Sequence, residues 1–212
     1  MKNLAFLVRR PDHTREAFRA HYEDIHAPLA METVMEGTTR YVRHHVCEVV
    51  HGDPFFDVIT AFEYASPEKA AALVARLATD AGARIIADEH SFMDRARNTF
   101  FVVEERPVMG AEARDAGLLL AACVKRPPDA DREEFVARYA DVHTAALLDA
   151  VASPAWCLHN LALGPEPWAD VVTQVHAASD AGLAGWARGL EATGARVQVV
   201  SVSEHETETP WD

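Results

Sequence analysis

Residues 9–29 read RRPDHTREAFRAHYEDIHAPL, and residues 125–147 read KRPPDADREEFVARYADVHTAAL. The two stretches share one pattern of aromatic and histidine residues. Each member of the pattern recurs 117 positions later: Phe18 as Phe135, Tyr22 as Tyr139 and His26 as His143. Because a duplicated structural unit leaves the same residues in the same order, we predict that the chain contains two copies of one unit.

The similarity continues downstream in the same order. It comprises YVRHHV at 41–46 with WCLHNL at 156–161, DVIT at 57–60 with DVVT at 170–173, and Gly-Ala-Arg at 82–84 with the same residues at 194–196. The first of these matches places His44 opposite His159. The segment RPVMGAEARDAG at 106–117 is the predicted joint, so we expect one domain at 1–108 and a second at 117–212.

Each copy shows the alternation of strand and helix signals that is typical of a mixed fold. In the first copy the predicted strands cover 4–8, 41–50, 56–64 and 99–105, with one helix over 15–31 and another from Ser66-Pro67 to Gly82. Thr14 is the predicted N-cap of the first helix, and Asp131 with Glu134 forms a capping box in the second copy. Strand-helix-strand-strand-helix-strand is the order of a ferredoxin-like unit, whose sheet has one face without helices. We therefore predict an α+β protein of two ferredoxin-like (βαββαβ) halves, packed sheet to sheet as an intramolecular dimeric α/β barrel.

The first copy carries residues that the second copy lacks. Ile85 to Thr99 follow Gly-Ala-Arg in the first copy, whereas Val197 directly follows Arg196 in the second. The second copy also has Thr144-Ala145-Ala146 after its histidine, where the first copy has Ala27-Pro28-Leu29. We therefore predict that the functional site lies in the first copy and that the second copy is a reduced partner.

Composition excludes several classes of partner. The chain has 212 residues and a formal net charge of −13, so the phosphates of nucleic acids and anionic membranes would be repelled. It has no apolar run of the roughly 20 residues that span a bilayer. Met1 to Leu4 lead straight into a strand pattern without a cleavage site, and the three cysteines form neither a CxxC pair nor an even set. We expect a cytoplasmic protein without a disulfide framework or a zinc site.

The strand end Val8-Arg9-Arg10-Pro11, then Phe18 and Tyr22, then His26-Ala27-Pro28-Leu29, resembles the opening of EthD-type proteins in the dimeric α/β-barrel superfamily. Residues 88–94, DEHSFMD, followed by a strand resemble the C-terminal stretch of the same family. The likeness covers nearly the whole first copy and is degraded in the second. It implies chemistry on small molecules, since fungal relatives are cofactor-independent decarboxylases and dehydratases of aromatic polyketides. The wider superfamily adds lactone isomerases, polyketide cyclases, quinone-forming monooxygenases and haem enzymes, because one scaffold hosts many reactions.

Tyr22 and His26 are four residues apart, which places both on one helical face together with Phe18. The imidazole of His26 titrates near neutrality and can take a proton from an acidic C–H or O–H. The alternative is a core histidine whose two nitrogens are bonded to the backbone. The resemblance favours the catalytic role.

His44 and His45 are adjacent on a predicted strand, so their side chains point to opposite faces of the sheet. The recurrence of His44 as His159 favours His44 as the residue that faces the helices and converges on His26. Two histidines and a carboxylate can also bind a metal. No HxH or HxxxH pair and no recurring ligand spacing is present around these positions, so no metal is expected.

Residues 88–92 supply the other candidates. A carboxylate of Asp88 or Glu89 held against Phe92 can serve as an acid or a base, the alternative being a solvated loop. We expect the catalytic residues to be His26, Tyr22, His44 and Asp88, and the substrate-binding residues to be Phe18, Arg40, Glu89, His90 and Phe92. The sequence has no GxSxG, GxGxxG or P-loop, so neither a nucleophilic serine nor a nucleotide, flavin or nicotinamide cofactor is expected.

The favoured function is a cofactor-independent lyase, isomerase or cyclase of secondary metabolism. It would decarboxylate, dehydrate, cyclise or isomerise a small aromatic or polyketide-like substrate. His26 would move a proton, Tyr22 would bond the substrate phenolate or carbonyl, and His44 or Asp88 would supply the opposite charge or proton. The alternatives are a cofactor-free or haem-dependent monooxygenase of the same superfamily, and a non-catalytic binding protein. We expect a monomeric pseudo-dimer, with a homodimer formed through the helices as the alternative.

Overall fold

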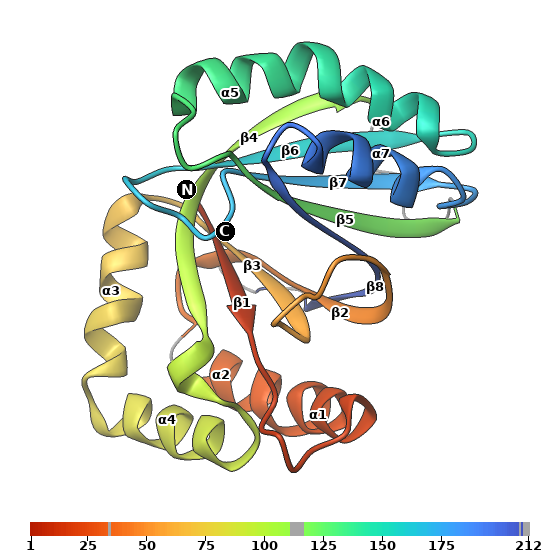
Figure 1. The fold of residues 1–212 in the computed structure, drawn as a ribbon. Helices are drawn as coiled ribbons and strands as arrows, with labels where there is room; N and C mark the ends of the chain where they lie inside the picture. The colour runs from red at the N-terminus through yellow and green to blue at the C-terminus, as the bar shows by residue number, and fades with distance from the viewer. Residues whose placement is uncertain (34, 111–116, 208, 210–212) are drawn as a thin grey trace. The chain divides into compact units, whose positions relative to one another are not determined.

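The computed structural model describes residues 1–33, 35–110, 117–207 and 209. Figure 1 shows its elements, which in chain order are β1 (Lys2–Leu7), α1 (Arg15–His21), η1 (Tyr22–His26), α2 (Ala27–Thr33), β2 (Thr38–His51), β3 (Val58–Tyr64), α3 (Pro67–Leu77), α4 (Asp80–Phe92), η2 (Arg95–Arg97), β4 (Thr99–Met109), β5 (Leu118–Lys125), α5 (Arg132–Arg138), η3 (Tyr139–His143), α6 (Thr144–Ala150), β6 (Trp156–Ala162), β7 (Val171–Ala177), α7 (Leu183–Glu191) and β8 (Arg196–Thr207). Both η1 and η3 are π-helices. Of the predicted joint at 106–117, residues 111–116 lie outside the described residues.

The strands pair in the order β1-β3-β2-β8-β5-β7-β6-β4, which is the order of a closed barrel, and the registers of β1, β3, β5, β6 and β7 are antiparallel. The predicted α+β class is confirmed. The chain forms two compact units. Unit 1 comprises Met1–His45, Phe55–Val102 and Glu204–Asp212, and unit 2 comprises Val46–Pro54 and Val103–Ser203. Strands β2, β4 and β8 therefore each contribute residues to both units.

In unit 1 the first helical segment is interrupted by a π turn. Thr14 caps α1 as predicted, because its hydroxyl accepts a backbone amide hydrogen bond from the first turn. The helix predicted over 15–31 is not one α-helix. It widens at Tyr22–His26, where the amide of Ala27 donates to the carbonyl of Tyr22 five residues earlier. The side chains that follow are therefore turned away from the positions that α-helical spacing predicts.

The same interruption occurs in unit 2 at the repeated sequence. Asp131 caps α5 as predicted, since its carboxylate accepts a hydrogen bond from the amide of Glu134. The π turn covers Tyr139–His143, and Thr144 donates through both its amide and its hydroxyl to the carbonyl of Tyr139. The three helical segments have the same lengths in both units, so this part of the sequence repeat is also a structural repeat.

The segment before the last strand of each unit differs from the prediction. The helix that begins at Pro67 ends at Leu77, and Gly82 lies inside α4, so the prediction that Gly82 ends a helix is wrong. In unit 1, α4 contacts η1 and α2, and in unit 2, α7 contacts α6. By this packing α7 is the counterpart of α4. Among the described residues, the elements that unit 1 adds are therefore α3 and the short 3-10 helix η2, and most of Ile85 to Thr99 is not an addition. The Gly-Ala-Arg match is therefore not structural, since Gly194 lies after α7 with a φ of 91°.

The strand register gives His159 a different counterpart from the predicted one. Thr60 pairs with Arg43, and the equivalent threonine, Thr173, pairs with His159. His159 therefore corresponds to Arg43 and not to His44. A shift of one residue moves a side chain to the other face of the sheet. The prediction that His44 faces the helices is wrong for this reason.

A buried aspartate anchors the start of the first helix in each unit. Asp57 accepts hydrogen bonds from the backbone amide and guanidinium of Arg9 and from the guanidinium of Arg15. Asp170 is fully buried and accepts hydrogen bonds from the backbone amide and guanidinium of Arg126. Each aspartate directly precedes a strand, β3 or β7, and binds the segment that follows the neighbouring strand, β1 or β5. It thus fixes the segment that leads into the first helix of its unit.

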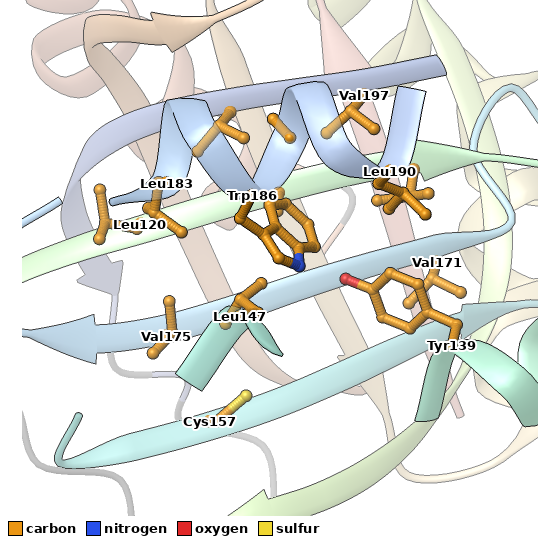
Figure 2. Close-up of a cluster of buried hydrophobic side chains, with 14 of the residues drawn as sticks. Leu120, Tyr139, Leu147, Cys157, Val171, Val175, Leu183, Trp186, Leu190 and Val197 are labelled. Carbon is orange, nitrogen blue, oxygen red and sulfur yellow. The ribbon is translucent and has the colours of Figure 1, made fainter. Parts of the chain in front are cut away.

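The core of unit 2 forms where α7 lies over the sheet (Figure 2). Leu183, Trp186 and Leu190 of α7 are buried in one cluster with side chains of α6 and of the strands. The indole of Trp186 also donates a 3.0 Å hydrogen bond to the backbone carbonyl of His143. This bond fixes α7 to the end of the π turn.

Replacing Asp170 with Asn is expected to lower the free energy of unfolding by about 3 kcal/mol, because Arg126 would lose its buried partner and keep only the exposed Glu166. Urea unfolding followed by circular dichroism measures the difference. Asp149→Asn, at an exposed position of α6, is the matched control and should change stability by less than about 0.5 kcal/mol. Equal effects of the two substitutions would contradict the anchoring role of Asp170.

Candidate active site

The π turn of unit 1 directs Tyr22 into the core, where its ring is buried. The Tyr22 hydroxyl lies 3.1 Å from the hydroxyl of Thr60, and the hydroxyl of Tyr41 donates to it over 3.1 Å. Burial raises the pKa of Tyr22 to about 12, so the phenol is neutral at physiological pH. Its hydroxyl thus has two protein partners, and its contact with a substrate stays a prediction.

His26, at the end of the same turn, is bonded to a carboxylate from α4. Its Nδ1 lies 2.8 Å from Oδ2 of Asp88, and Nε2 of His21 lies 2.8 Å from Oδ1 of the same carboxylate. The side chains of His26 and Asp88 are only 6% and 12% exposed. The structure therefore brings two of the predicted catalytic residues into direct contact and adds a second histidine to them.

The partner of Nδ1 determines which nitrogen of His26 is available for chemistry. A carboxylate accepts hydrogen bonds, so we assign the proton to Nδ1 and the lone pair to Nε2. Among the described residues, no side chain or backbone group forms a hydrogen bond with Nε2. Burial lowers the pKa of His26, and the hydrogen bond and charge of Asp88 oppose this effect without cancelling it. His26 is therefore a neutral imidazole at neutral pH.

Aromatic side chains surround this pair. Phe92, at the end of α4, stacks on His21 with a ring-centroid distance of 4.3 Å and lies 5.2 Å from the ring of His26. Phe92 also packs on Phe18, with ring centroids 5.4 Å apart. These apolar surroundings desolvate His26 and strengthen its bond to the carboxylate. Of the predicted substrate-binding residues, Phe92 thus lies beside the candidate base, and Phe18 packs on Phe92.

A second charged network begins at Glu23, the residue after Tyr22. Its carboxylate lies 2.6 Å from a guanidinium nitrogen of Arg43 and 2.6 Å from Nε2 of His45. Burial raises the pKa of Glu23, but the hydrogen bonds from His45 and Arg43 outweigh burial and lower the pKa to about 2. The ring of His45 lies 5.6 Å from that of Tyr22. His45 is therefore the strand histidine that faces the helices.

Two other predicted site residues of β2 bond to carboxylates of β8. Nε2 of His44 is 3.0 Å from the carboxylate of Glu204. The guanidinium of Arg40 bonds to Glu206 and also to Glu63 of β3. Both side chains thus have protein partners, and the catalytic role predicted for His44 and the substrate contact predicted for Arg40 stay predictions.

The two residues that follow Asp88 point toward a different partner. Glu89 forms a 2.7 Å ion pair with Arg95, and burial raises the pKa of its carboxyl group. His90 is exposed, and its ring also lies near Arg95, at 3.3 Å. Of the two predicted carboxylates of α4, Asp88 alone is bonded to His26.

Four residues of these networks were not among the predicted site residues, namely His21, Glu23, Arg43 and His45. His26 is five positions after His21, a spacing that places two side chains on different sides of an α-helix. The π turn is what brings both rings to one carboxylate. The sequence did distinguish Glu23, because the second copy has Ala140 at the equivalent position, 117 residues later, and so lacks the carboxylate.

Two further features were searched for in the described part of the chain. Within the described ranges, no three His, Cys, Asp or Glu side chains are arranged to hold a metal ion. None of the helices described here has the length and apolar character of a membrane span.

Asp88→Asn is expected to lower the pKa of His26 further, because the substitution removes the negative charge that opposes the effect of burial. An NMR titration of the His26 ring protons measures the change. Asp80→Asn, at an exposed position in the first turn of the same helix, is the control and should leave the titration unchanged. An unchanged or raised His26 pKa in the Asp88 variant would show that the two groups are not coupled.

Comparisons with known proteins agree with this fold. The chain is similar to the structure of an anthrone oxidase-like protein, with a TM-score of 0.58 and 14% identity over 99% of this chain and 92% of that chain. It is also similar to a proposed monooxygenase from Fusobacterium nucleatum, with a TM-score of 0.53 and 9% identity over 98% of this chain and 94% of that one. A third similar structure, of a proposed chlorite dismutase, has a TM-score of 0.50 and 10% identity over 95% and 94% of the two chains.

At these identities the likeness concerns the fold alone. The sequence has no significant match among curated proteins. The profile of the EthD domain matches residues 10–96, the segment that contains the π turn with His26 and the carboxylate of Asp88. Residues 10–96 of this chain therefore belong to the EthD domain family.

Proposed function

We propose that the chain is an enzyme in which His26 removes a proton from a small aromatic or polyketide-like substrate. The observation that carries this proposal is the hydrogen bond between His26 Nδ1 and Asp88, at 2.8 Å, in a buried and mostly aromatic environment. It leaves Nε2 as the basic nitrogen. Because the pKa of His26 lies below its ordinary value, the imidazole is in its basic form at neutral pH.

Asp88 has two roles in this scheme. It holds the ring in the tautomer that exposes the Nε2 lone pair, and its charge stabilises the imidazolium that forms when Nε2 accepts the proton. His21 bonds to the second oxygen of the carboxylate and restricts its rotation. The arrangement is therefore a base, an orienting carboxylate and a residue that positions the carboxylate.

The substrate supplies the rest of the chemistry. Loss of a proton leaves an electron pair that conjugated carbonyls of an aromatic or polyketide-like molecule can delocalise. When the proton comes from carbon, the anion closes a ring, regains the proton at another carbon, or expels hydroxide, which leaves as water with the proton that His26 took. When the proton comes from a carboxyl group, carbon dioxide leaves, the conjugated carbonyls take up the electron pair of the broken bond, and His26 returns the proton to that carbon. The ring of Phe92 beside His26, itself packed on Phe18, favours an aromatic ligand over a polar one. These reactions need no group beyond the base and an electrostatic partner.

A second candidate function adds dioxygen to the same first step. One similar fold belongs to an anthrone oxidase-like protein, and the anion formed by His26 is the species that would react with oxygen. If the oxygen-activating group were haem, Nε2 of His26 is the nitrogen that could ligate the iron, since a carboxylate on the other nitrogen is the usual support of a histidine ligand. Haem would then supply the activation of oxygen, and the purified protein would be coloured.

We also propose that each half of the chain is one ferredoxin-like unit. The strand order contains β4-β1-β3-β2 for the first half and β8-β5-β7-β6 for the second. Numbered within its own half, each series reads 4-1-3-2, which fits the βαββαβ order predicted from the sequence.

The mass of the product separates the two functions. Purified protein is incubated with anthrones and with polyketide acids, with and without oxygen. We expect loss of carbon dioxide or water, or an isomer of unchanged mass, without a need for oxygen. His26→Ala should lower kcat/KM about 10²- to 10⁴-fold, the usual contribution of a general base. Asp80→Asn, at an exposed position on α4, is the control and should change kcat/KM less than about twofold.

Other outcomes have defined meanings. A gain of oxygen that occurs only in air would favour the monooxygenase. Tight binding without turnover, unchanged in His26→Ala, would favour a binding protein and would contradict the role of His26 as a base.

The activity is expected to fall as the pH falls, because protonation of Nε2 removes the base. The midpoint should lie below the ordinary pKa of histidine, since burial lowers the pKa of His26. Asp88→Asn should move this midpoint to a still lower pH while reducing the maximal rate. A pH–rate profile of kcat/KM measures both effects, and a midpoint that does not move in the Asp88 variant would assign the titration to another group.

A further inference from the structure

The second half of the chain contains a cavity of about 300 Å³ beside its own π turn. Phe135, Arg138 and His143 line it, together with Thr193 from the segment between α7 and β8. Within the described ranges, neither the guanidinium of Arg138 nor the ring of His143 has a hydrogen-bond or ion-pair partner. The charge of Arg138 adds to the effect of burial in lowering the pKa of His143, so the two groups are close in space.

The counterparts of these residues in unit 1 are Phe18, His21 and His26, each 117 positions earlier. In unit 1 the carboxylate of Asp88 bridges the two histidines. The ring of Phe92 packs on Phe18 and on both histidine rings. In unit 1, Phe18, His21 and His26 are thus bound by one carboxylate and one aromatic ring, both from α4.

The equivalent helix of unit 2 supplies no carboxylate at this place. Ile85, Asp88 and Phe92 of α4 have the same spacing as three buried residues of α7, namely Leu183, Trp186 and Leu190. Trp186 stands at the position of Asp88, and its indole donates to the backbone carbonyl of His143 rather than to its ring. Arg138 and His143 therefore line a cavity without the acceptor that their counterparts bind.

We propose that this cavity binds a small aromatic monocarboxylate. The ligand carboxylate accepts hydrogen bonds from Arg138 and His143, as Asp88 does from two histidines in unit 1. Its ring packs on Phe135, as the ring of Phe92 packs on Phe18. The site is separate from the candidate base His26 and does not depend on the function proposed for it.

Three carboxylates also line the cavity, and they restrict the ligand. They belong to Asp129, Asp131 and Glu134. The carboxylate of Asp131 caps α5 by accepting the amide hydrogen bond of Glu134. Their combined negative charge repels a dianion more strongly than a monoanion. A ligand with one carboxylate therefore binds more tightly than a dicarboxylate or a phosphate.

The test is an NMR titration of ¹⁵N-labelled protein with benzoate. We expect saturable shifts of the amides of Phe135, His143 and Thr193. Arg138→Gln should weaken benzoate binding about tenfold or more, because a charge-assisted hydrogen bond is lost. Arg188→Gln, at an exposed position of α7, is the matched control and should leave the affinity within about twofold.

Two further ligands test the chemistry of recognition. Benzyl alcohol keeps the ring without the charge, and phthalate adds a second carboxylate, so both should bind more weakly than benzoate. The amides that are followed belong to unit 2, so benzoate at His26 cannot be mistaken for this site. Absence of saturable shifts at these amides, equal affinity of Arg138→Gln, or tighter binding of phthalate would each overturn the proposal.

Discussion

A five-residue π turn at Tyr22–His26 determines how the first helical segment of unit 1 presents its side chains, and the candidate site depends on it. The hydrogen bond from the amide of Ala27 to the carbonyl of Tyr22 closes the turn. The wider turn lets the Tyr22 phenol reach Thr60 in the sheet while His26 reaches Asp88 on α4. Such turns are rare and occur frequently at functional sites, because they redirect side chains without ending the helix.

The two units build different chemistry on the same turn. Unit 1 carries Glu23, Arg43, His45 and Asp88 where unit 2 carries Ala140, His159, Leu161 and Trp186. Because unit 2 folds with mostly apolar residues at these places, the fold itself does not require the charged ones. Burying charged groups costs free energy unless they are paired. We infer that unit 1 retains its networks for function, which supports the proposed role of His26.

Periodic features of the sequence predicted much of this structure. The repeated Tyr-x-x-x-His and the caps Thr14 and Asp131 follow from local patterns that neighbouring residues determine. Asp88 was a candidate by its residue type and the family resemblance, but its contact with His26, 62 positions earlier, is a tertiary contact that the structure reveals. Features that depend on a strand register or a helical turn being correct to one residue were less predictable. The choice between His44 and His45 depends on how β2 pairs with β3, and the sequence match was displaced by one position. The contact of His21 with Asp88 requires a π turn, which α-helical periodicity does not anticipate.

The protonation state of His26 is the most direct test of this account, since every step of the proposed chemistry requires an unprotonated Nε2 opposite a protonated Nδ1. Long-range ¹⁵N–¹H NMR correlations of the imidazole ring report both nitrogens separately. The account predicts at neutral pH a Nδ1 shift typical of a protonated nitrogen and a Nε2 shift typical of a nitrogen with a lone pair. The opposite tautomer, or two protonated nitrogens, would contradict the role of His26 as a base held by Asp88.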